Sequence, residues 1–257
     1  MAQLFSEIHK YNPYHDSKGR FTTGGKASFF SMPKDLKLAA KLKEKEKNRS
    51  AGSDRCVDRA ACKRIKTRKD GVDYGKAQAD KTKLTREEMD CIKRYTGPGY
   101  IAVNKHLRGT GKIANAELKS VKQTTKTLSK AIQRSKTSED IIVYRGITPS
   151  ALGITTDKDY KMLIGKTIRD KGFMSSSISS EVAGNFAKKE KIQNKTVHGA
   201  VFEIAVPKGT NGIFADGNSS FETECEFIMQ QGTGIKIVDV KLSRTGKPAT
   251  IIAEYGG

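Results

Sequence analysis

Hydrophobic positions recur with a helical period in the middle of the chain. A first helix is predicted within Leu84–Gly97, because Thr85 followed three residues later by Glu88 forms a capping box. A second helix is predicted over residues 99–107 and a third from about Asn115. The apolar stripes behind these predictions are Met89, Ile92 and Tyr95 in the first helix, and Leu118, Val121, Leu128 and Ile132 in the third.

After Ser138 the hydrophobic pattern changes to the two-residue period of β-strands. Because helices come first and strands follow, the sequence indicates an α+β domain and not a doubly wound parallel sheet. The predicted strands are rich in β-branched and aromatic residues. They are Asp140–Ile147, Ala200–Val206, Glu224–Gln230, Ile235–Leu242 and Ala249–Tyr255.

The N-terminal part differs from this domain in composition. The 257 residues include 48 Lys and Arg against 28 Asp and Glu, a net charge of +20, and only 36% are hydrophobic. Residues 33–76 are rich in Lys and poor in large apolar side chains, so they cannot offset their ordering entropy. We interpret them as linker or loosely held helix; a DNA-binding arm is the alternative, but no aromatic residues interleave with the charges to stack on bases. The expected parts are a segment 1–30, a basic, poorly packed linker 31–83 and a domain 84–257.

Composition also excludes several classes of protein. No run approaches the about 18 apolar residues of a membrane span, so no membrane partner is expected. The first ten residues lack the basic and apolar regions of a secretion signal. The four cysteines contain no CxxC pair and the four histidines no ligand pair, so neither a metal site nor a disulfide framework is expected.

Arg145 ends an apolar strand and is followed by Gly146. A charge in that setting must be paired or must face a cleft. The planar guanidinium fork suits a phosphate group. A structural salt bridge is the alternative interpretation of Arg145 taken alone.

The segment Gly172–Ser179 reads GFMSSSIS. In a strand, Ser175 and Ser177 share one face and Ser176 lies on the other. Two inward hydroxyls can hydrogen-bond a carboxylate or a ribose. A polar edge strand is the alternative.

Glu224 and Glu226 stand two residues apart at the start of a predicted strand, which places both side chains on the same side. Like charges so close repel each other. The repulsion between the two carboxylates is relieved by a bound cation, by a shared proton or by a substrate that develops positive charge. An exposed acidic edge in a basic protein is the alternative for this pair alone.

Taken in chain order, these three sites resemble the ADP-ribosyltransferase superfamily, in the Arg-Ser-Glu subgroup of many bacterial toxins. Arg145 in VYRG, Ser175–Ser177 for the family's Ser-Thr-Ser and Glu224–Glu226 for its Glu-x-Glu carry the resemblance. The segment Tyr95–Gly109 is similar to the family's helical motif. The resemblance covers about residues 84–257 and implies N-terminal helices followed by a two-sheet mixed β core.

The resemblance implies that NAD is the substrate. Glu226, held in position by Ser175, would stabilise the oxocarbenium-like centre through a ribose hydroxyl. Arg145 would bind the pyrophosphate, and Glu224 would bind and deprotonate a target arginine. The other contacts that it implies are Gly146, Ser177, Phe186 and Lys189 for the cofactor, with Phe186 against the nicotinamide, and Phe221 of the loop Gly212–Phe221 for the target.

Three functions remain open at this point. The first is an NAD-dependent mono-ADP-ribosyltransferase acting on arginine of host proteins. The second is NAD hydrolysis, or ADP-ribosylation of nucleic acid, on the same scaffold, toward which the charge of +20 would steer the protein. The third is a noncatalytic phage head component.

The segment Tyr11–Gly25 carries a second resemblance, to a short segment found in tailed-phage head proteins. Its residues are mostly turn formers with little to bury. The resemblance implies a docking tag, so the protein is expected in the phage head and in the host cytoplasm. Phage head proteins and packaged DNA would be its partners. A disordered tail is the alternative.

Overall fold

The computed structural model describes residues 57–243 and 245–256. The three predicted helices are confirmed as α4, α5 and α6. The capping box at the start of α4 forms as expected: the Glu88 N–H donates to Thr85 Oγ1 at 3.3 Å, and the Thr85 N–H donates to Glu88 Oε2 at 2.8 Å. The helices are α3 (Arg68–Ala79), α4 (Arg86–Arg94), α5 (Tyr100–Arg108), α6 (Asn115–Arg134) and α7 (Ser180–Gly184), and a π-helical turn, Tyr95–Gly99, joins α4 to α5.

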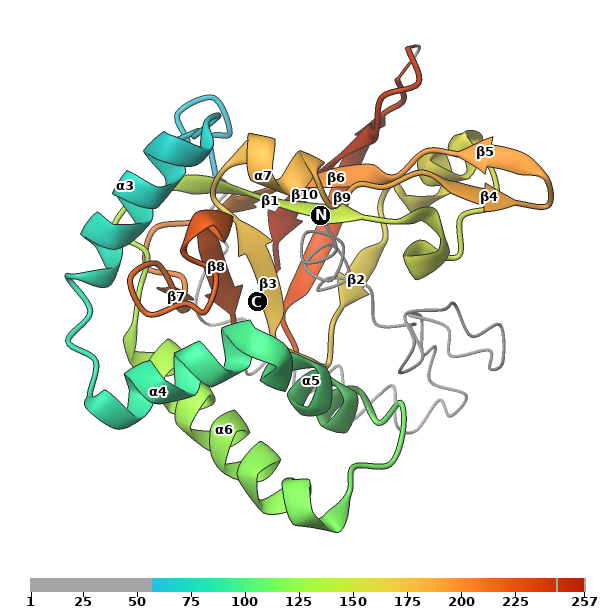
Figure 1. Cartoon of the computed structure of the whole chain (residues 1–257). Helices are drawn as coiled ribbons and strands as arrows, with labels where there is room; N and C mark the ends of the chain where they lie inside the picture. The colour runs from blue at the N-terminus through green and yellow to red at the C-terminus, as the bar shows by residue number, and fades with distance from the viewer. Residues whose placement is uncertain (1–56, 244, 257) are drawn as a thin grey trace, which may run out of the picture.

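The strands form a mixed sheet in the order β2-β9-β10-β6-β1-β3-β8-β7 (Figure 1). The pair β10–β6 is parallel, and the other pairs in this sheet are antiparallel. The predicted strands are all present, although β8 begins at Glu226 and not at Glu224. The strands are β1 (Ile141–Ile147), β2 (Thr167–Arg169), β3 (Met174–Ser177), β6 (Ala200–Val206), β7 (Gly212–Phe214), β8 (Glu226–Met229), β9 (Gly234–Lys241) and β10 (Ala249–Tyr255), with β4 (Glu190–Ile192) and β5 (Lys195–Val197) as a separate hairpin.

The sheet is nearly divided between β1 and β3. These two strands share one register pair, Tyr144 with Ser177, whereas β1 and β6 share seven. The result is a five-stranded part, β2-β9-β10-β6-β1, and a three-stranded part, β3-β8-β7. This arrangement is the α+β fold with a two-part mixed core that the resemblance implies.

Of the three hydrophobic clusters in the described residues, two hold the sheet and the helical layer together. The larger one includes side chains from both parts of the sheet, such as Val143, Ile251 and Phe227. The second packs the helical layer of α4, α5 and α6 against the three-stranded part, through residues such as Leu128 and Ile228 (Figure 1). The helices therefore cover the strands that carry the serine and glutamate motifs.

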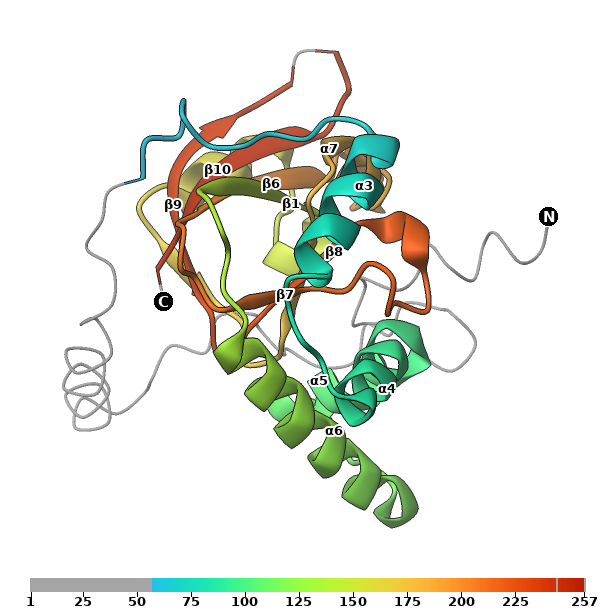
Figure 2. The same ribbon diagram turned by 90° about the vertical axis from the view of Figure 1, so that its left-hand side faces the viewer.

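Helix α3 lies in the segment that the sequence analysis treats as linker. Figure 2 shows it beside β7 and β8. A Cβ added at Gly71 would lie 2.7 Å from Cys225 Sγ, and one added at Gly75 would lie 2.0 Å from Asp216 Oδ2, so both glycines permit this close approach. Ile65, 4% exposed, also belongs to the larger core. The packed part of the chain therefore includes residues upstream of Leu84. The buried face of α3 includes the small residues Gly71, Gly75 and Ala79, which hydrophobic patterning detects poorly.

The segment 1–30, with its phage-like Tyr11–Gly25, lies outside the described residues, as does the linker as far as residue 56. Among the residues that the structure does describe, no helix is long and apolar enough to cross a membrane.

We expect deletion of residues 1–56 to leave a cooperatively folding protein. Deletion of residues 1–80 should lower the free energy of unfolding by at least ~2–5 kcal/mol, the usual cost of removing one large buried aliphatic side chain, because Ile65 and α3 leave the core. Urea unfolding followed by circular dichroism measures both variants. Equal stability of the two would place the start of the domain at Leu84 after all.

Candidate active site

Arg145 lies on β1 directly after the single residue pair that joins β1 to β3. Its guanidinium Nη1 donates to the carbonyl oxygen of Ser175 on β3. A Cβ added at the next residue, Gly146, would lie 2.1 Å from the carbonyl oxygen of Ala183 and 2.8 Å from Phe186 Cβ. Gly146 therefore lets the end of α7 and the residues that follow it pass directly over β1, which brings Phe186 close to the backbone of Gly146.

Tyr95 is the buried centre of a hydrogen-bond network beneath Ser175. Its Oη lies 3.4 Å from Ser175 Oγ and 3.4 Å from the carbonyl oxygen of Phe173, and it accepts from Asn104 Nδ2 at 3.1 Å. The Phe173 N–H donates to Asn104 Oδ1 at 3.0 Å. Burial is the main cause that raises the Tyr95 pKa to about 12, and the Glu226 carboxylate adds to it. The Tyr95 hydroxyl therefore keeps its proton. Sequence analysis included Tyr95 and Asn104 in a motif without assigning these contacts.

The three serines of β3 alternate as predicted. Ser177 pairs with Glu226 across the antiparallel ladder, so these two side chains share a face, and Ser176 pairs with Phe227. The Ser176 hydroxyl donates to the Phe227 carbonyl oxygen at 3.0 Å. The Ser177 hydroxyl donates to the Glu224 carbonyl oxygen at 2.9 Å. We therefore interpret Ser177 as a residue that positions the glutamate turn, and its expected cofactor contact stays a prediction.

Glu224 and Glu226 do not lie on one strand. Glu224 ends a short 3-10 turn, Glu226 begins β8, and Cys225 between them is left-handed, with φ 51° and ψ 50°. Such a conformation is uncommon for a residue other than glycine. The prediction that strand alternation sets the relative directions of the Glu224 and Glu226 side chains is therefore wrong. The left-handed turn at Cys225 sets these directions instead.

Both carboxylates are buried: Glu224 is 8% exposed and Glu226 is 3% exposed. Burial raises the Tyr100 pKa first, and the charges of Tyr95, Glu224 and Glu226 raise it further. The exposed acidic edge considered above is therefore wrong. Two buried like charges are costly, and this cost fits a site that receives positive charge.

The turn is packed from behind by α3. The Cys225 thiol donates to the Arg68 carbonyl oxygen at 3.4 Å, and the Ile178 N–H donates to the Cys225 carbonyl oxygen at 2.9 Å. Burial, followed by the Asp216 carboxylate, raises the Cys225 pKa to about 12. Because the thiol stays protonated, Cys225 is a packing residue and not a nucleophile.

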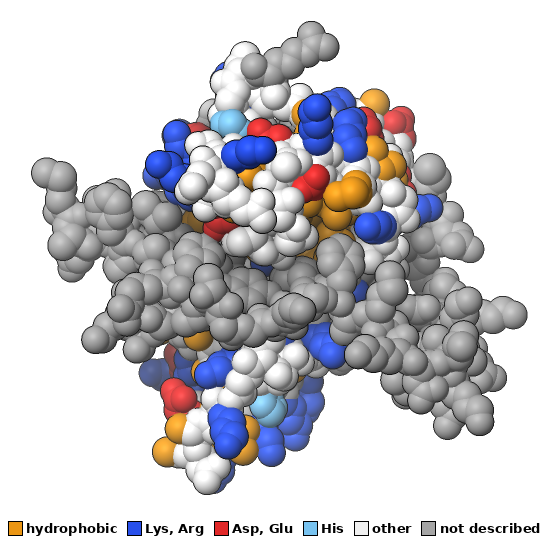
Figure 3. Space-filling view, turned by 90° about the vertical axis from the view of Figure 1, so that its right-hand side faces the viewer, with side chains coloured by type: hydrophobic (Ala, Val, Ile, Leu, Met, Phe, Trp, Pro, Cys, Tyr) orange, Lys and Arg blue, Asp and Glu red, His pale blue; other side chains and the backbone are white. Residues whose placement is uncertain are grey.

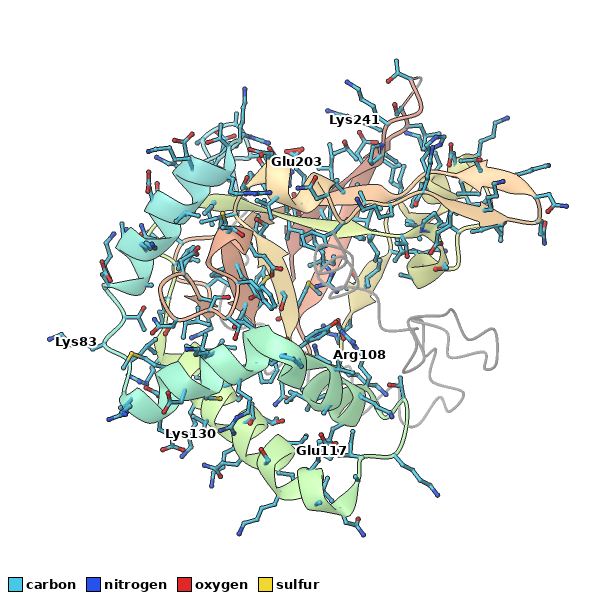
Figure 4. All side chains as sticks on the ribbon, viewed as in Figure 1. Lys83, Arg108, Glu117, Lys130, Glu203 and Lys241 are labelled. Carbon is cyan, nitrogen blue, oxygen red and sulfur yellow. The ribbon has the colours of Figure 1, made fainter. Side chains whose placement is uncertain are left out.

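A partly buried ion pair, which sequence analysis missed, ties α5 to the turn between β2 and β3. Arg108 donates from Nε to Asp170 Oδ1 at 2.8 Å and from Nη2 to Oδ2 at 2.7 Å (Figure 4). Burial alone would raise the Asp170 pKa, but Arg108 and the more distant Arg145 lower it overall. Asp170 lies in the sequence RDKG, and nothing in this sequence distinguishes it from an acidic residue of an ordinary turn.

The remaining predicted residues lie around this centre. Phe221 is half-buried at the end of the loop Gly212–Phe221, whose first three residues form β7. Its carbonyl oxygen accepts from the Glu224 N–H at 3.2 Å, and its contact with a target stays a prediction. The Ser220 N–H donates to Thr96 Oγ1 at 2.8 Å, so the π-helical turn holds this loop. Lys189 is exposed between α7 and β4, and its role stays a prediction. Within the described part of the chain, no group of three or more His, Cys, Asp and Glu side chains could hold a metal ion.

Comparison with known proteins gives a consistent set of matches. A family model described as "ADP-ribosyltransferase exoenzyme" matches residues 72–255. The NAD(+)--arginine ADP-ribosyltransferase EFV of Enterococcus faecalis is 29% identical over 158 residues, which are 61% of this chain and 30% of that protein. The chain thus spans under a third of that relative's length.

Two further matches cover most of this chain and most of the matched protein. The mono-ADP-ribosyltransferase C3 of Clostridium botulinum D phage is 23% identical over 196 residues, 72% of this chain and 75% of that protein. The crystal structure of C3stau2 from S. aureus with NAD covers 76% of this chain and 98% of that chain, with a TM-score of 0.60 and 18% identity. The structural match shows a shared fold.

We expect Tyr95→Phe to disturb the site more than a matched tyrosine elsewhere. The change leaves the ring in its core but removes the acceptor of the buried Asn104 amide, so unfolding free energy should fall by ~1–3 kcal/mol. Tyr74→Phe, which removes one hydrogen bond to Glu139, should cost ~0.5–1.5 kcal/mol.

Enzyme kinetics with NAD should separate the two variants further, because only Tyr95 contacts Ser175. We expect kcat to fall in Tyr95→Phe and to stay near the wild-type value in Tyr74→Phe. The same kcat in both would show that the Tyr95 network does not position Ser175.

Proposed function

Because the chain belongs to the ADP-ribosyltransferase exoenzyme family, we propose that it is an NAD-dependent mono-ADP-ribosyltransferase that modifies arginine side chains of host proteins. The observation that carries this proposal is the pair of buried glutamates, Glu224 and Glu226, on either side of one left-handed residue. The E. faecalis relative is named for arginine transfer, and the S. aureus relative has a structure with NAD.

In this proposal Arg145 binds the pyrophosphate of NAD and Phe186 binds its nicotinamide ring. The guanidinium binds the pyrophosphate as a charge-assisted fork, and the ring of Phe186 lies against the nicotinamide. The close packing of Phe186 on Gly146, the residue after Arg145, supports this assignment. Binding at both ends orients the bond between nicotinamide and ribose.

Glu226 acts on the bond that breaks. As nicotinamide leaves, the ribose carbon develops oxocarbenium character, and a carboxylate close to that carbon lowers the energy of the positive charge. Glu226 starts β8 opposite Ser177, on the face of β3 that also carries Ser175. Burial strengthens this electrostatic interaction because little water screens it.

Glu224 acts on the incoming nucleophile. A carboxylate binds the target guanidinium through paired hydrogen bonds and accepts its proton as the new nitrogen–carbon bond forms. The loop that ends at Phe221 leads directly into Glu224, so it would present the target side chain to this carboxylate. Water in place of the guanidinium gives NAD hydrolysis, the second candidate reaction.

Two substitutions separate these roles. Glu226→Gln removes the charge that opposes the developing cation, so both NAD hydrolysis and transfer should fall by roughly 10²–10³-fold. Glu224→Gln should lower transfer to arginine by roughly 10²–10⁴-fold and leave hydrolysis largely intact. Labelled NAD with an arginine acceptor measures both reactions in one assay.

Glu117→Gln, an exposed change on α6, serves as the control and should alter neither rate. Equal loss of both reactions in the two site variants, with NAD binding retained, would contradict the division of roles. Full transfer by Glu224→Gln would point to an acceptor other than arginine.

We also propose that the protein is phage-encoded and carried in the phage head, from which it would reach the host cytoplasm. The resemblance of Tyr11–Gly25 to phage head proteins supports this, and one relative comes from a Clostridium botulinum phage. A net charge of +20 would favour retention beside packaged DNA.

Deletion of residues 1–30 should abolish incorporation into phage particles and leave NAD cleavage unchanged. Immunoblots of purified particles, normalised to a capsid protein, measure incorporation. A truncated protein present at the full-length level would refute the docking tag without affecting the catalytic proposal.

A further inference from the structure

Helix α6 carries a stripe of four lysines, Lys119, Lys122, Lys126 and Lys130, which we call the lysine stripe. All four side chains are exposed. At 3.6 residues per turn they fall within roughly 80° of one another around the helix and span about 16 Å along it. The face of α6 that packs into the core, through Val121, Leu128 and Ile132, lies on the other side.

The lysine stripe differs from the other charged positions on the helices. Lys69 on α3 pairs with Asp73 at 2.9 Å, and Arg134 at the end of α6 pairs with Glu88 of α4. On α6 itself the acidic side chain, Glu117, lies in the first turn and outside the stripe. In the part of the chain that the structure describes, the ion pairs involve basic residues other than these four lysines.

Neighbouring lysines in the stripe are three or four residues apart, so they repel one another across each turn of α6. Like charges at this spacing destabilise a helix. A polyanion laid along the stripe would relieve this repulsion. Figure 3 shows Lys and Arg side chains gathered on the lower, helical lobe of the molecule.

The surroundings of the stripe favour duplex DNA over other polyanions. The exposed large hydrophobic side chains of the described residues are Met89, Ile101, Met162 and Ile164, and none lies on α6, so membrane insertion is not supported. Helix α6 contains no aromatic residue to stack on unpaired bases or to anchor a protein partner. Lysines alone read phosphates and not bases.

We propose that the lysine stripe on α6 binds the phosphate backbone of double-stranded DNA without sequence preference. A duplex presents one charge per about 1.7 Å of its axis, so a segment as long as the stripe offers more phosphates than there are lysines. This interaction is separate from catalysis and does not depend on the N-terminal segment.

The test compares two full-length variants with the same net charge. One changes the four stripe lysines to Gln; the other changes Lys158, Lys195, Lys236 and Lys241 to Gln, which are exposed and lie outside α6. Figure 4 labels Lys130 and Lys241 on opposite sides of the molecule. Fluorescence anisotropy with a 30-base-pair DNA of arbitrary sequence, at several salt concentrations, gives the affinity and its salt dependence.

The stripe variant should bind DNA roughly 10- to 1000-fold more weakly at about 0.1 M salt. Its slope of log K against log salt should be smaller by about 3–4, which corresponds to four lost phosphate contacts. The control variant should keep most of the wild-type slope, and both variants should cleave NAD at the wild-type rate.

Equal weakening in both variants would overturn the proposal, because net charge and not the stripe would then determine binding. Wild-type affinity in the stripe variant would also overturn it. So would stripe-dependent binding to phosphatidylserine vesicles or to polyglutamate that is as tight as binding to DNA, since it would show that the stripe does not select a duplex. Retained NAD cleavage shows in each case that the variant is folded.

Discussion

The left-handed backbone at Cys225 is the constraint on which the proposed site depends. It joins two buried glutamates, Glu224 and Glu226, through one turn. Two like charges in a poorly solvated region repel, so the surrounding structure must hold them there. That cost is useful where a guanidinium and a developing oxocarbenium ion are the charges to be received.

Two elements stabilise this turn from different directions, and a third holds Ser175 on the strand that packs beside it. Strand β3 contributes the Ser177 hydroxyl, which binds the Glu224 carbonyl oxygen. Helix α3 packs Gly71 against the Cys225 side chain, and any larger residue there would collide with the thiol. On the helical side, Tyr95 links α5 to the Ser175 hydroxyl through Asn104. The division of the sheet between β1 and β3 then places Arg145 at the same centre.

Sequence patterns predicted the elements that depend on local periodicity, and they missed the contacts that depend on tertiary packing. The capping box of α4 and the β-branched strand β1 have clear local signals. Helix α3 has a weak local signal because small residues, Gly71, Gly75 and Ala79, make up much of its buried face. The left-handed residue between the glutamates is held by distant elements, so alternation gave the wrong geometry for this pair. The Arg108–Asp170 ion pair spans 62 residues and has no local signature.

A crystal structure of the protein with NAD tests the central claim most directly. We expect a hydroxyl of the nicotinamide-side ribose within hydrogen-bond distance of Glu226, about 2.6–3.2 Å. We also expect the pyrophosphate at Arg145, the nicotinamide against Phe186 and a left-handed Cys225. NAD bound with its ribose away from both glutamates, or an extended backbone at Cys225 that separates their side chains, would contradict the account.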